Sequence, residues 1–437
     1  MWTTFGRRSW PTFRRRLTAA LVEAYEAELR VLRCIDFDDM PLLAVRALRE
    51  NTWLQRALLA KYPVLAVDEY QDLGGALHRI VMGLCFSTGM RLFAVGDVDQ
   101  SIYGFTGARP ELLQQLCERE DVEVVRLRLN YRSGSSIVAA SAYALGEHRD
   151  YQAAGGAGEG TIYFHPQYGQ YQAHAQYVFS NILPEIMARA PDLKFSDVAI
   201  LYPAAWIGNA VAEAAQANNF PFVRTDGNAL YPRGSRLMRW FEQCAAWCVS
   251  GWKTGTPRFA RIARDGRALF REALRTEEEA DVFNRALMRA LWRRRDSSVS
   301  VHEWLASLNT ELIESLVGAS RSLSEEQAHL SAFLERTNSG GDCEEMTLEE
   351  FSGQGEGNNS IILSTLHSAK GREFGAVIMF AMDNGQVPRA VAGPPVIESR
   401  RLFYVGFTRA KSEVHMVYSA NRPSPFVLEV QRRLNVQ

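Results

Sequence analysis

The sequence predicts an α/β fold with parallel sheets, built in two parts, with a helical segment inserted in the second part. Three observations lead to this prediction. Short apolar runs alternate with sequence of helical periodicity, which is typical of parallel sheets covered on both faces. A Gly- and Ala-rich connector, QAAGGAGEGT at 152–161, separates two such regions. Strand-like sequence resumes at residue 360 after a long helical stretch.

The first part begins with helical sequence and continues with three apolar runs. Residues 12–33 carry leucines and a tyrosine at spacings of three and four, which predicts a helix. Further helices are expected at 40–60 and 74–86. The runs VLAV, RLFAVGD and VEVVRL predict buried strands at 64–67, 91–97 and 122–127.

The second part repeats this alternation and contains the insertion. An arginine-rich stretch at 251–337 predicts helices only, and the polar, Gly-rich stretch at 340–360 predicts an exposed linker. RRLFYVGFTRAK at 400–411 predicts a helix. Strands are expected at TIYFH, DVAILYP, FPFVRTD, SIILSTLHS and AVIMFAM, which start at residues 161, 197, 220, 360 and 376.

Composition excludes several classes of protein. The net charge of −1 gives no global basic field, although a local basic groove remains compatible with it. No apolar stretch reaches the roughly 18 residues of a membrane span, and the basic start has no apolar core of a secretory signal. The six cysteines have no zinc-binding spacing, and Cys244 and Cys248 are expected to pack in a core. We expect a reduced, cytoplasmic protein.

Carboxylates cluster where the first strand ends, in VLAVDEYQD at 64–72. Ligands of open α/β sheets bind at this end of the strands. Asp68 can hold Mg²⁺ through its water shell, and Glu69 can orient and deprotonate an attacking water. The alternative is a solvated acidic loop. Gln71 and Asp72 have a second interpretation as caps of the next helix, and DFDDM at 36–40 is interpreted as a helix start.

Five sequence blocks together resemble the superfamily 1 DNA helicases of the UvrD/Rep/PcrA group. The resemblance extends from about residue 20 to SPFVLEV at 424–430, and DFDDM matches the segment that precedes the first block in that family. The blocks, similar to motifs II to VI, are VDEYQD at 67–72, GDVDQSIYGFTGA at 96–108, LNYRS at 129–133, STLHSAKGREF at 364–374 and RLFYVGFTRAK at 401–411.

The resemblance implies P-loop NTPase-type RecA-like domains that bind ATP with Mg²⁺, with single-stranded DNA crossing them. It implies that the first domain is incomplete and that the insertion corresponds to the family's 2B domain. The expected parts are a helical remnant of 1B at 1–40, the later part of 1A at 41–127, the first part of 2A at 128–250, the 2B-like insertion at 251–357 and the second part of 2A at 358–437.

The resemblance also implies roles for residues at the nucleotide. Asp68 is expected to hold Mg²⁺ and Glu69 to activate water. Gln100 is expected to contact the terminal phosphate, and Gln71 to link nucleotide state to the domain interface. Arg132 and Arg409 are similar to the two arginines that neutralise charge on the transferred phosphoryl group, and Glu373 to the carboxylate that contacts the sugar.

Four residues are similar to the family's DNA contacts: Tyr103, Phe105, His367 and Lys370. Tyr103 and Phe105 offer faces on which bases can stack; the alternative is that both are core aromatics. The family more often has Trp then Arg where this sequence has Phe105 and Thr106. The implied partners are single-stranded DNA and single/double-strand junctions, with no membrane.

One part of the family pattern is absent from the sequence. No G-x-x-x-x-G-K-S/T loop is present, and GWKTGT at 251–256 lacks the leading glycines. We therefore expect an N-terminally truncated helicase. The implied function is an ATP-dependent 3′–5′ helicase in DNA repair or replication restart. The alternatives are an ATPase-dead remnant that binds DNA or a partner, and, more remotely, a metal nuclease built on Asp68, Glu69 and DFDD.

Overall fold

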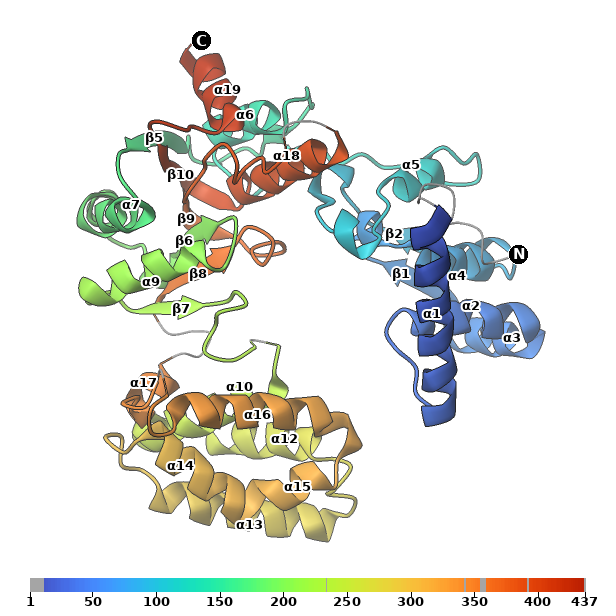
Figure 1. Ribbon diagram of the computed structural model, residues 1–437, viewed down its shortest axis with the longest axis vertical. Coiled ribbons are helices and arrows are strands. Elements are labelled where there is room, and N and C mark those ends of the chain that lie inside the picture. The colour runs from blue at the N-terminus through green and yellow to red at the C-terminus, as the bar shows by residue number, and fades with distance from the viewer. Residues whose placement is uncertain (1–11, 233, 342, 354–358, 391–392, 436–437) are drawn as a thin grey trace. The chain divides into compact units, whose positions relative to one another are not determined.

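The computed structural model describes residues 12–232, 234–341, 343–353, 359–390 and 393–435. The chain divides into two compact units, unit 1 (Met1–Arg126) and unit 2 (Leu127–Gln437), which are treated separately (Figure 1). Both are α/β with parallel strands, as predicted. No helix in the described ranges combines the length and the apolar character needed to cross a membrane.

Unit 1 contains mostly helices around a two-stranded sheet. The predicted helix at 40–60 is in fact two helices, because the chain breaks at Asn51. The elements are α1 (Thr12–Leu32), α2 (Asp39–Glu50), α3 (Thr52–Lys61), β1 (Val64–Val67), η1 (Tyr70–Asp72), α4 (Gly75–Phe86), β2 (Arg91–Ala94), η2 (Val98–Gln100), η3 (Gly104–Thr106) and α5 (Glu111–Cys117).

The sheet of unit 1 is covered on one face only. β1 and β2 pair in parallel, with Ala66 opposite Phe93. Leu65 and Leu92 pack toward a core that includes Tyr70 and Leu84. The other face is exposed, with Phe93 at 64% of its maximal exposure. A parallel sheet is normally buried on both faces, so this sheet is incomplete within the described residues.

Unit 2 is built on a six-stranded parallel sheet in the order β5-β10-β9-β6-β8-β7. The helices α7 (Tyr171–Tyr177), α8 (Leu183–Arg189) and α9 (Ile207–Ala217) pack on one face. The strands are β5 (Thr161–Gln167), β6 (Val198–Tyr202), β7 (Phe222–Arg224), β8 (Ile361–Thr365), β9 (Phe374–Met379) and β10 (Ala410–Ser419); the helices α6 (Ser135–Leu145), α18 (Pro394–Phe407) and α19 (Pro425–Asn435), and the short pair β3 (Leu129–Asn130) and β4 (Gln152–Ala153), complete this part.

The helical segment of unit 2 has its own core, which includes Trp240, Trp304 and Phe333. Cys244 and Cys248 are fully buried in it, as predicted. The helices are α10 (Arg236–Ala246), α11 (Trp252–Thr254), α12 (Phe259–Leu269), α13 (Glu277–Arg293), α14 (Val301–Leu308), α15 (Glu314–Gly318), α16 (Ser324–Thr337) and α17 (Leu348–Ser352), with π-helical turns at Trp247–Gly251 and Asn309–Ile313.

Two predicted boundaries of this helical segment need correction. The segment begins at Arg236, earlier than the predicted residue 251, because α10 packs into the helical core. The stretch at 340–360 is not simply an exposed linker, since it contains α17. Leu348 and Phe351 of α17 are fully buried in the same core.

One predicted strand and one predicted helix end were also wrong. Residues 122–127 form no strand, because no neighbouring strand pairs with them, and Val125 is 75% exposed. The predicted helix at 400–411 ends at Phe407 in α18. Ala410 already belongs to β10, which pairs with β9 and β5 and is the longest strand of the sheet.

Candidate nucleotide and nucleic-acid site

The acidic cluster lies in the loop that directly follows β1 in unit 1. Asp68 and Glu69 are both exposed, and the Glu69 backbone N–H donates to Asp68 Oδ1 at 2.8 Å. Glu69 has φ 52° and ψ 44°, in the left-handed region that non-glycine residues rarely adopt. Such a conformation costs about 1–3 kcal/mol and persists only where neighbours hold it.

Gln71 is the neighbour that holds this loop. Its side chain is fully buried, its amide group donates to Glu69 Oε2, and its Oε1 accepts from the Asp97 N–H at 2.8 Å. The loop after β1 is thereby tied to the loop after β2. Gly96 makes this possible, since a Cβ at Gly96 would lie 2.6 Å from Gln71 Oε1.

Gln100 belongs to the same network. Its side-chain amide donates to Asp97 Oδ2 at 2.7 Å, and the Asp99 N–H donates to Asp97 Oδ1 at 2.9 Å. Asp97 therefore joins Gln71 and Gln100, although the sequence analysis gave it no role. Its position directly after a strand, like that of Asp68, was the signal that could have identified it.

Tyr103 and Phe105 lie next to each other beyond Gln100. Their ring centroids are 6.1 Å apart at an interplanar angle of 63°. Phe105 is 71% exposed and Tyr103 is partly exposed. Neither ring is therefore buried as a core aromatic would be, and Phe105 presents a face to solvent.

In unit 2, Arg132 and Glu373 form an ion pair, although 241 positions separate them in the sequence. Arg132 Nε donates to Glu373 Oε2 at 2.8 Å, and Lys411 Nζ lies 2.8 Å from Glu373 Oε1. The hydrogen bonds from Lys411 and Arg132 lower the pKa of Glu373 to about 2. Lys411 was missed by the sequence analysis, although it stands two positions after Arg409 in the same block.

Arg409 is almost fully buried, at 2% exposure. Its Nε donates to the Val405 carbonyl at 3.0 Å and its Nη1 to the Arg372 carbonyl at 3.3 Å. The Arg132 guanidinium donates to the Thr408 carbonyl at 3.4 Å, directly beside Arg409 in the chain. The structure thus brings Arg132, Glu373, Lys411 and Arg409 into one region, and the predicted arginine-finger role remains a prediction.

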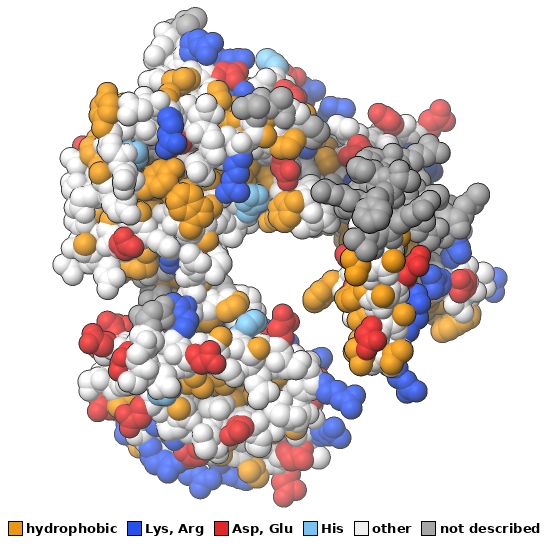
Figure 2. All heavy atoms as spheres, viewed as in Figure 1, with side chains coloured by type: hydrophobic (Ala, Val, Ile, Leu, Met, Phe, Trp, Pro, Cys, Tyr) orange, Lys and Arg blue, Asp and Glu red, His pale blue; other side chains and the backbone are white. Residues whose placement is uncertain are grey.

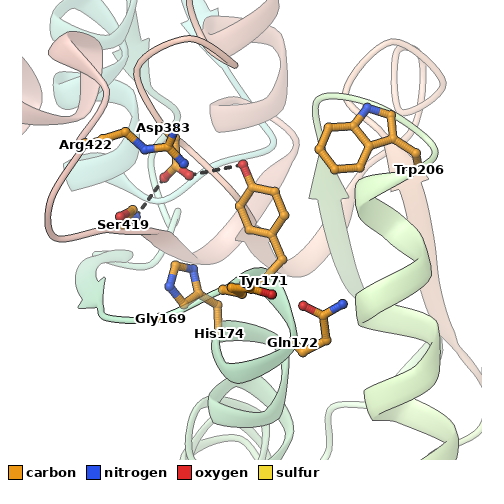
Figure 3. Close-up of a pocket in the computed structure, with 9 residues that line it drawn as sticks. Gly169, Tyr171, Gln172, His174, Trp206, Asp383, Ser419 and Arg422 are labelled. Carbon is orange, nitrogen blue, oxygen red and sulfur yellow. Dashed lines mark hydrogen bonds between the residues drawn. The ribbon is translucent and has the colours of Figure 1, made fainter.

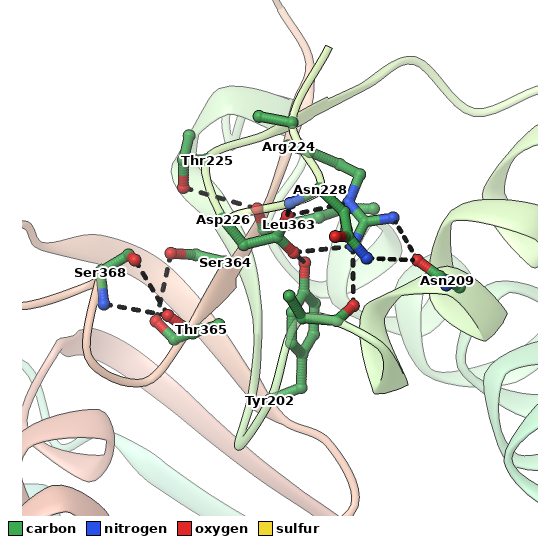
Figure 4. A network of polar contacts seen from close by, with 12 residues as sticks. Tyr202, Asn209, Arg224, Thr225, Asp226, Asn228, Leu363, Ser364, Thr365 and Ser368 are labelled. Carbon is green, nitrogen blue, oxygen red and sulfur yellow. Dashed lines mark hydrogen bonds and ion pairs between the residues drawn. The ribbon is translucent and has the colours of Figure 1, made fainter. Parts of the chain in front are cut away.

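His367 and Lys370 lie on the turn that follows β8. Thr365 caps this turn, because its Oγ1 accepts from the Ser368 N–H at 3.1 Å (Figure 4). Burial, with a smaller contribution from Arg389, lowers the pKa of His367. His367 is therefore a neutral donor and acceptor at neutral pH, and Lys370 supplies the cationic group of this turn.

Residues 257–275 carry arginines at spacings of three and four, which would share one face of a continuous helix, but these arginines do not all lie on one helix. α12 begins after Arg258 and ends at Leu269, before Arg271. Arg261 and Arg264 are exposed on α12, and each pairs with Asp265 at 3.6 and 3.3 Å. Figure 2 shows basic side chains gathered along the edge of the helical segment where α13 lies.

The residues in the loop after β1 fit part of an ATP–Mg²⁺ site. The described residues contain no group of three or more His, Cys, Asp or Glu side chains placed to hold a metal ion, so a protein-made metal cage does not fit. Mg²⁺ commonly takes one or two carboxylates, waters and substrate phosphates, which suits Asp68. The phosphate-cradling loop is not among the 437 residues, so the chain supplies no such loop.

Sequence models of known families match both units. The UvrD/REP helicase N-terminal domain matches residues 8–120, and the UvrD-like helicase C-terminal domain matches residues 269–421. The second match covers the later helices of the inserted segment together with β8, β9 and β10.

Similar curated proteins cover nearly the whole chain. PcrA, an ATP-dependent DNA helicase of Leuconostoc citreum, is 26% identical over an alignment of 486 positions, which covers 95% of this chain and 63% of PcrA. Rep of Escherichia coli (strain K12) is 24% identical, over 95% of this chain and 70% of Rep. UvrD1 of Mycobacterium tuberculosis (strain ATCC 25618 / H37Rv) is 24% identical, over 94% of this chain and 62% of UvrD1. The chain thus spans about two thirds of the length of these relatives and belongs to the UvrD/Rep/PcrA-like helicases.

Proposed function

We propose that this protein functions as an ATP-dependent DNA helicase that couples ATP hydrolysis to movement along single-stranded DNA. The relatives PcrA, Rep and UvrD1 are all named as ATP-dependent DNA helicases. The proposed substrates are single strands and single/double-strand junctions, the direction is 3′ to 5′, and the setting is DNA repair or replication restart in the cytoplasm.

The single observation that carries the proposal is the loop after β1. Glu69 is held in a left-handed conformation by Gln71, and Gln71 is tied in turn to Asp97. Backbone strain that neighbouring side chains maintain is typical of functional sites. A solvated acidic loop would need neither the strain nor the buried glutamine.

Each residue then has a role in phosphoryl transfer. Mg²⁺, when bound, would be held at Asp68 and would neutralise phosphate charge. Glu69 orients the attacking water and accepts its proton, and Gln100 contacts the terminal phosphate. Arg132 and Arg409 neutralise the charge that develops on the transferred group, a contribution of about 10³–10⁵ in rate.

Both arginines have to change partners in order to do this. Arg132 must exchange part of its contact with Glu373 for phosphate, which leaves Glu373 with Lys411 and free to contact the sugar. Arg409 must release the Val405 or the Arg372 carbonyl.

A second candidate function is supported by the absent phosphate loop. A chain without G-x-x-x-x-G-K-S/T supplies no backbone cradle and no lysine for the phosphates. The 437 residues by themselves are then a module that binds DNA or a partner without ATP turnover. The predicted N-terminal truncation remains a prediction.

A strand-displacement assay tests the helicase proposal. The protein is extended at its N-terminus by a segment that carries a phosphate loop, and is given duplexes with a single-stranded tail at the 3′ or the 5′ end. We expect ATP-dependent displacement from the 3′-tailed duplex only, and none with Glu69→Gln. Displacement from the 5′-tailed duplex would contradict the direction, and displacement by Glu69→Gln would contradict the site.

A further inference from the structure

A pocket of about 330 Å³ lies at the carboxyl ends of the strands in unit 2, apart from the groups described above. Its lining comes from segments that follow β5, β6, β9 and β10, which are neighbours in the sheet. The next strand beyond β6 is β8, whose turn carries His367 and Lys370. The pocket and this turn therefore both lie where the carboxyl ends of the strands meet.

One wall of the pocket is aromatic and open to solvent. Trp206 is 55% exposed, and its ring centroid is 5.9 Å from that of Tyr171. In Figure 3 the Tyr171 ring lies between Trp206 and Asp383. An exposed tryptophan at the mouth of a pocket offers a face on which a planar ring can stack.

The Trp206 loop is held in place by contacts outside the pocket. Arg224 Nη2 donates to the Ala205 carbonyl at 2.8 Å, and the same guanidinium pairs with Asp226 at 2.8 Å (Figure 4). Tyr202 also donates to Asp226. Trp206 thus stands on a loop that is fixed before any ligand binds, which reduces the ordering entropy lost on binding.

The floor of the pocket does not suit a metal ion. Asp383 is fully buried, and both its oxygens are occupied, by the Ser419 N–H at 2.7 Å and the Tyr171 hydroxyl at 3.2 Å. Burial and the nearby Asp383 carboxylate raise the pKa of Tyr171 to about 12, so its hydroxyl keeps its proton.

Two other groups of the lining have unused polar capacity. His174 is 1% exposed, and neither of its ring nitrogens has a hydrogen-bond partner among the described residues. Arg422 has no carboxylate within ion-pair distance in the part of the chain that the structure describes. An aromatic face together with an unpaired guanidinium matches a planar base joined to a phosphate.

We propose that this pocket binds one nucleotide of single-stranded DNA, with its base stacked on Trp206 and its phosphate at Arg422. The inference rests on the proposed function and adds a base-binding site to it. Single-stranded DNA is favoured over a free nucleotide because of the turn that carries His367 and Lys370. This turn follows β8, which is the neighbour of β6 in the sheet, and Trp206 follows β6. A strand that contacts this turn can place its next bases at the pocket.

The test measures binding of the 437-residue chain to a thymidine homopolymer and to an abasic strand of equal length, over a range of salt concentrations. Trp206→Ala should weaken binding to the homopolymer about fivefold to 150-fold, the equivalent of the ~1–3 kcal/mol of one stacked base. Its salt slope should be unchanged, and the abasic strand should bind both proteins equally. Trp206→Phe should restore most of the affinity.

Other variants distinguish the contribution of the phosphate to affinity from that of the base. Arg422→Ala should reduce the salt slope by about 1. Trp53→Ala, at a tryptophan that is 67% exposed on α3 of unit 1, is the matched control and should bind like the parent. Equal melting temperatures of the parent and Trp206→Ala establish that the fold is intact.

Three results would overturn the inference. The first is unchanged affinity of Trp206→Ala for the homopolymer. The second is an equal loss of affinity for the abasic strand. The third is displacement of the bound homopolymer by thymidine monophosphate at a nucleotide concentration no higher than that at which free homopolymer displaces it. Failure of the parent chain to bind any single strand is a different result, because it would refute the DNA-binding part of the proposed function as well.

Discussion

Glu69 shows how a single residue can be positioned by the side chains around it. Its left-handed backbone is unfavourable for a residue with a Cβ, yet Gln71 binds its carboxylate from a fully buried position. The glutamine in turn requires a glycine at position 96, because any side chain there would occupy its site. The chemistry proposed for Glu69 thus depends on two residues that need not touch the nucleotide.

Gly96→Ala tests this dependence. The added Cβ would lie 2.6 Å from Gln71 Oε1 and 3.1 Å from the Tyr70 N, so the loop after β1 must move. We expect a loss of roughly 1–3 kcal/mol in the free energy of unfolding, as for overpacking elsewhere. The control is Gly83→Ala in α4, where nothing lies within 4 Å and a gain of about 0.5–1 kcal/mol is expected. Equal melting temperatures for the two variants would contradict the account.

Phe105→Ala tests the stacking assignment in unit 1. Phe105 is 71% exposed, so its removal should leave the melting temperature nearly unchanged. If a base stacks there, single-strand binding should weaken by about 1–3 kcal/mol. Val125→Ala, also at an exposed position, serves as the control for both measurements. A large fall in melting temperature with unchanged affinity would make Phe105 a structural residue.

The sequence alone located the carboxylates that follow the first strand, whose roles remain predictions, but it did not reveal the contacts between residues distant in the sequence. Asp68 and Glu69 follow an apolar run, which the sequence shows directly. Asp97 and Lys411 acquire their importance only when the fold brings Asp97 to Gln71 and Lys411 to Glu373. Their places, Asp97 after a strand and Lys411 near Arg409, mark them as candidates in the sequence, but tertiary packing sets their partners, which no local pattern encodes.

At the scale of elements, the pairing of β5 with β10 places a chain of titratable groups in the sheet. His165 Nε2 lies 3.0 Å from His415 Nδ1, and His415 Nε2 lies 2.9 Å from Glu413 Oε2. Arg189 pairs with Glu413 at 2.9 Å. Burial, His415 and Arg189 lower the pKa of His165 to about 4, and burial lowers that of His415.

These shifts predict that unit 2 loses stability in mild acid. His165 binds a proton near pH 6.5 when unfolded but only near pH 4 when folded, so the unfolded state gains protons first as the pH falls. The pKa of Glu413 is lowered to about 2, with hydrogen bonds from His415 and Arg189 outweighing its desolvation, so its contribution is lost only below pH 4.5. The free energy of unfolding should therefore fall between pH 6.5 and 4.

Denaturant unfolding at pH 7 and pH 5 measures this effect. His165→Phe keeps a ring against Tyr163 and His415 but cannot be protonated. The difference between its free energies of unfolding at pH 7 and pH 5 should therefore be smaller than in the parent. His148→Phe changes an exposed histidine of the same unit and should leave the difference as it is in the parent. A difference that is the same in all three proteins would rule out the β5–β10 histidines as its source.

Element boundaries were harder to predict than element types, for physical reasons. Residues 122–127 have the β-branched composition of a strand but find no neighbour to pair with. The block RLFYVGFTRAK reads as one helix, yet Thr408 ends α18 and the chain enters β10 two residues later. In both cases the available hydrogen-bond partners decided the outcome.

At the scale of the whole molecule, exposed apolar surface is concentrated in unit 1. It holds 19 of the 28 large hydrophobic side chains that are exposed among the described residues. They include Leu21, Tyr25 and Val31 on α1, where Figure 2 shows hydrophobic side chains, and Phe93 on the uncovered sheet face. Exposed apolar side chains favour association where they adjoin one another on the surface.

Phe93→Lys tests whether the uncovered sheet face drives self-association. Light scattering of concentrated protein should decrease, because a charge on an open sheet face opposes pairing of copies. The melting temperature should not fall, since Phe93 is 64% exposed. Tyr168→Lys, at a 74% exposed position in unit 2, is the control and should scatter like the parent. Unchanged scattering with Phe93→Lys would show that this face does not mediate association.

The proposed function depends above all on Glu69, which we propose activates water for ATP hydrolysis in a helicase of the UvrD type. The most direct measurement is phosphate release in the presence and absence of single-stranded DNA, for the 437-residue chain and for the form extended by a phosphate loop. We expect DNA-stimulated release by the extended form, none by its Glu69→Gln variant, and negligible release by the 437 residues alone. Release that survives Glu69→Gln would refute this role of Glu69, and DNA-stimulated release by the 437-residue chain would show that its ATP turnover does not need a phosphate loop.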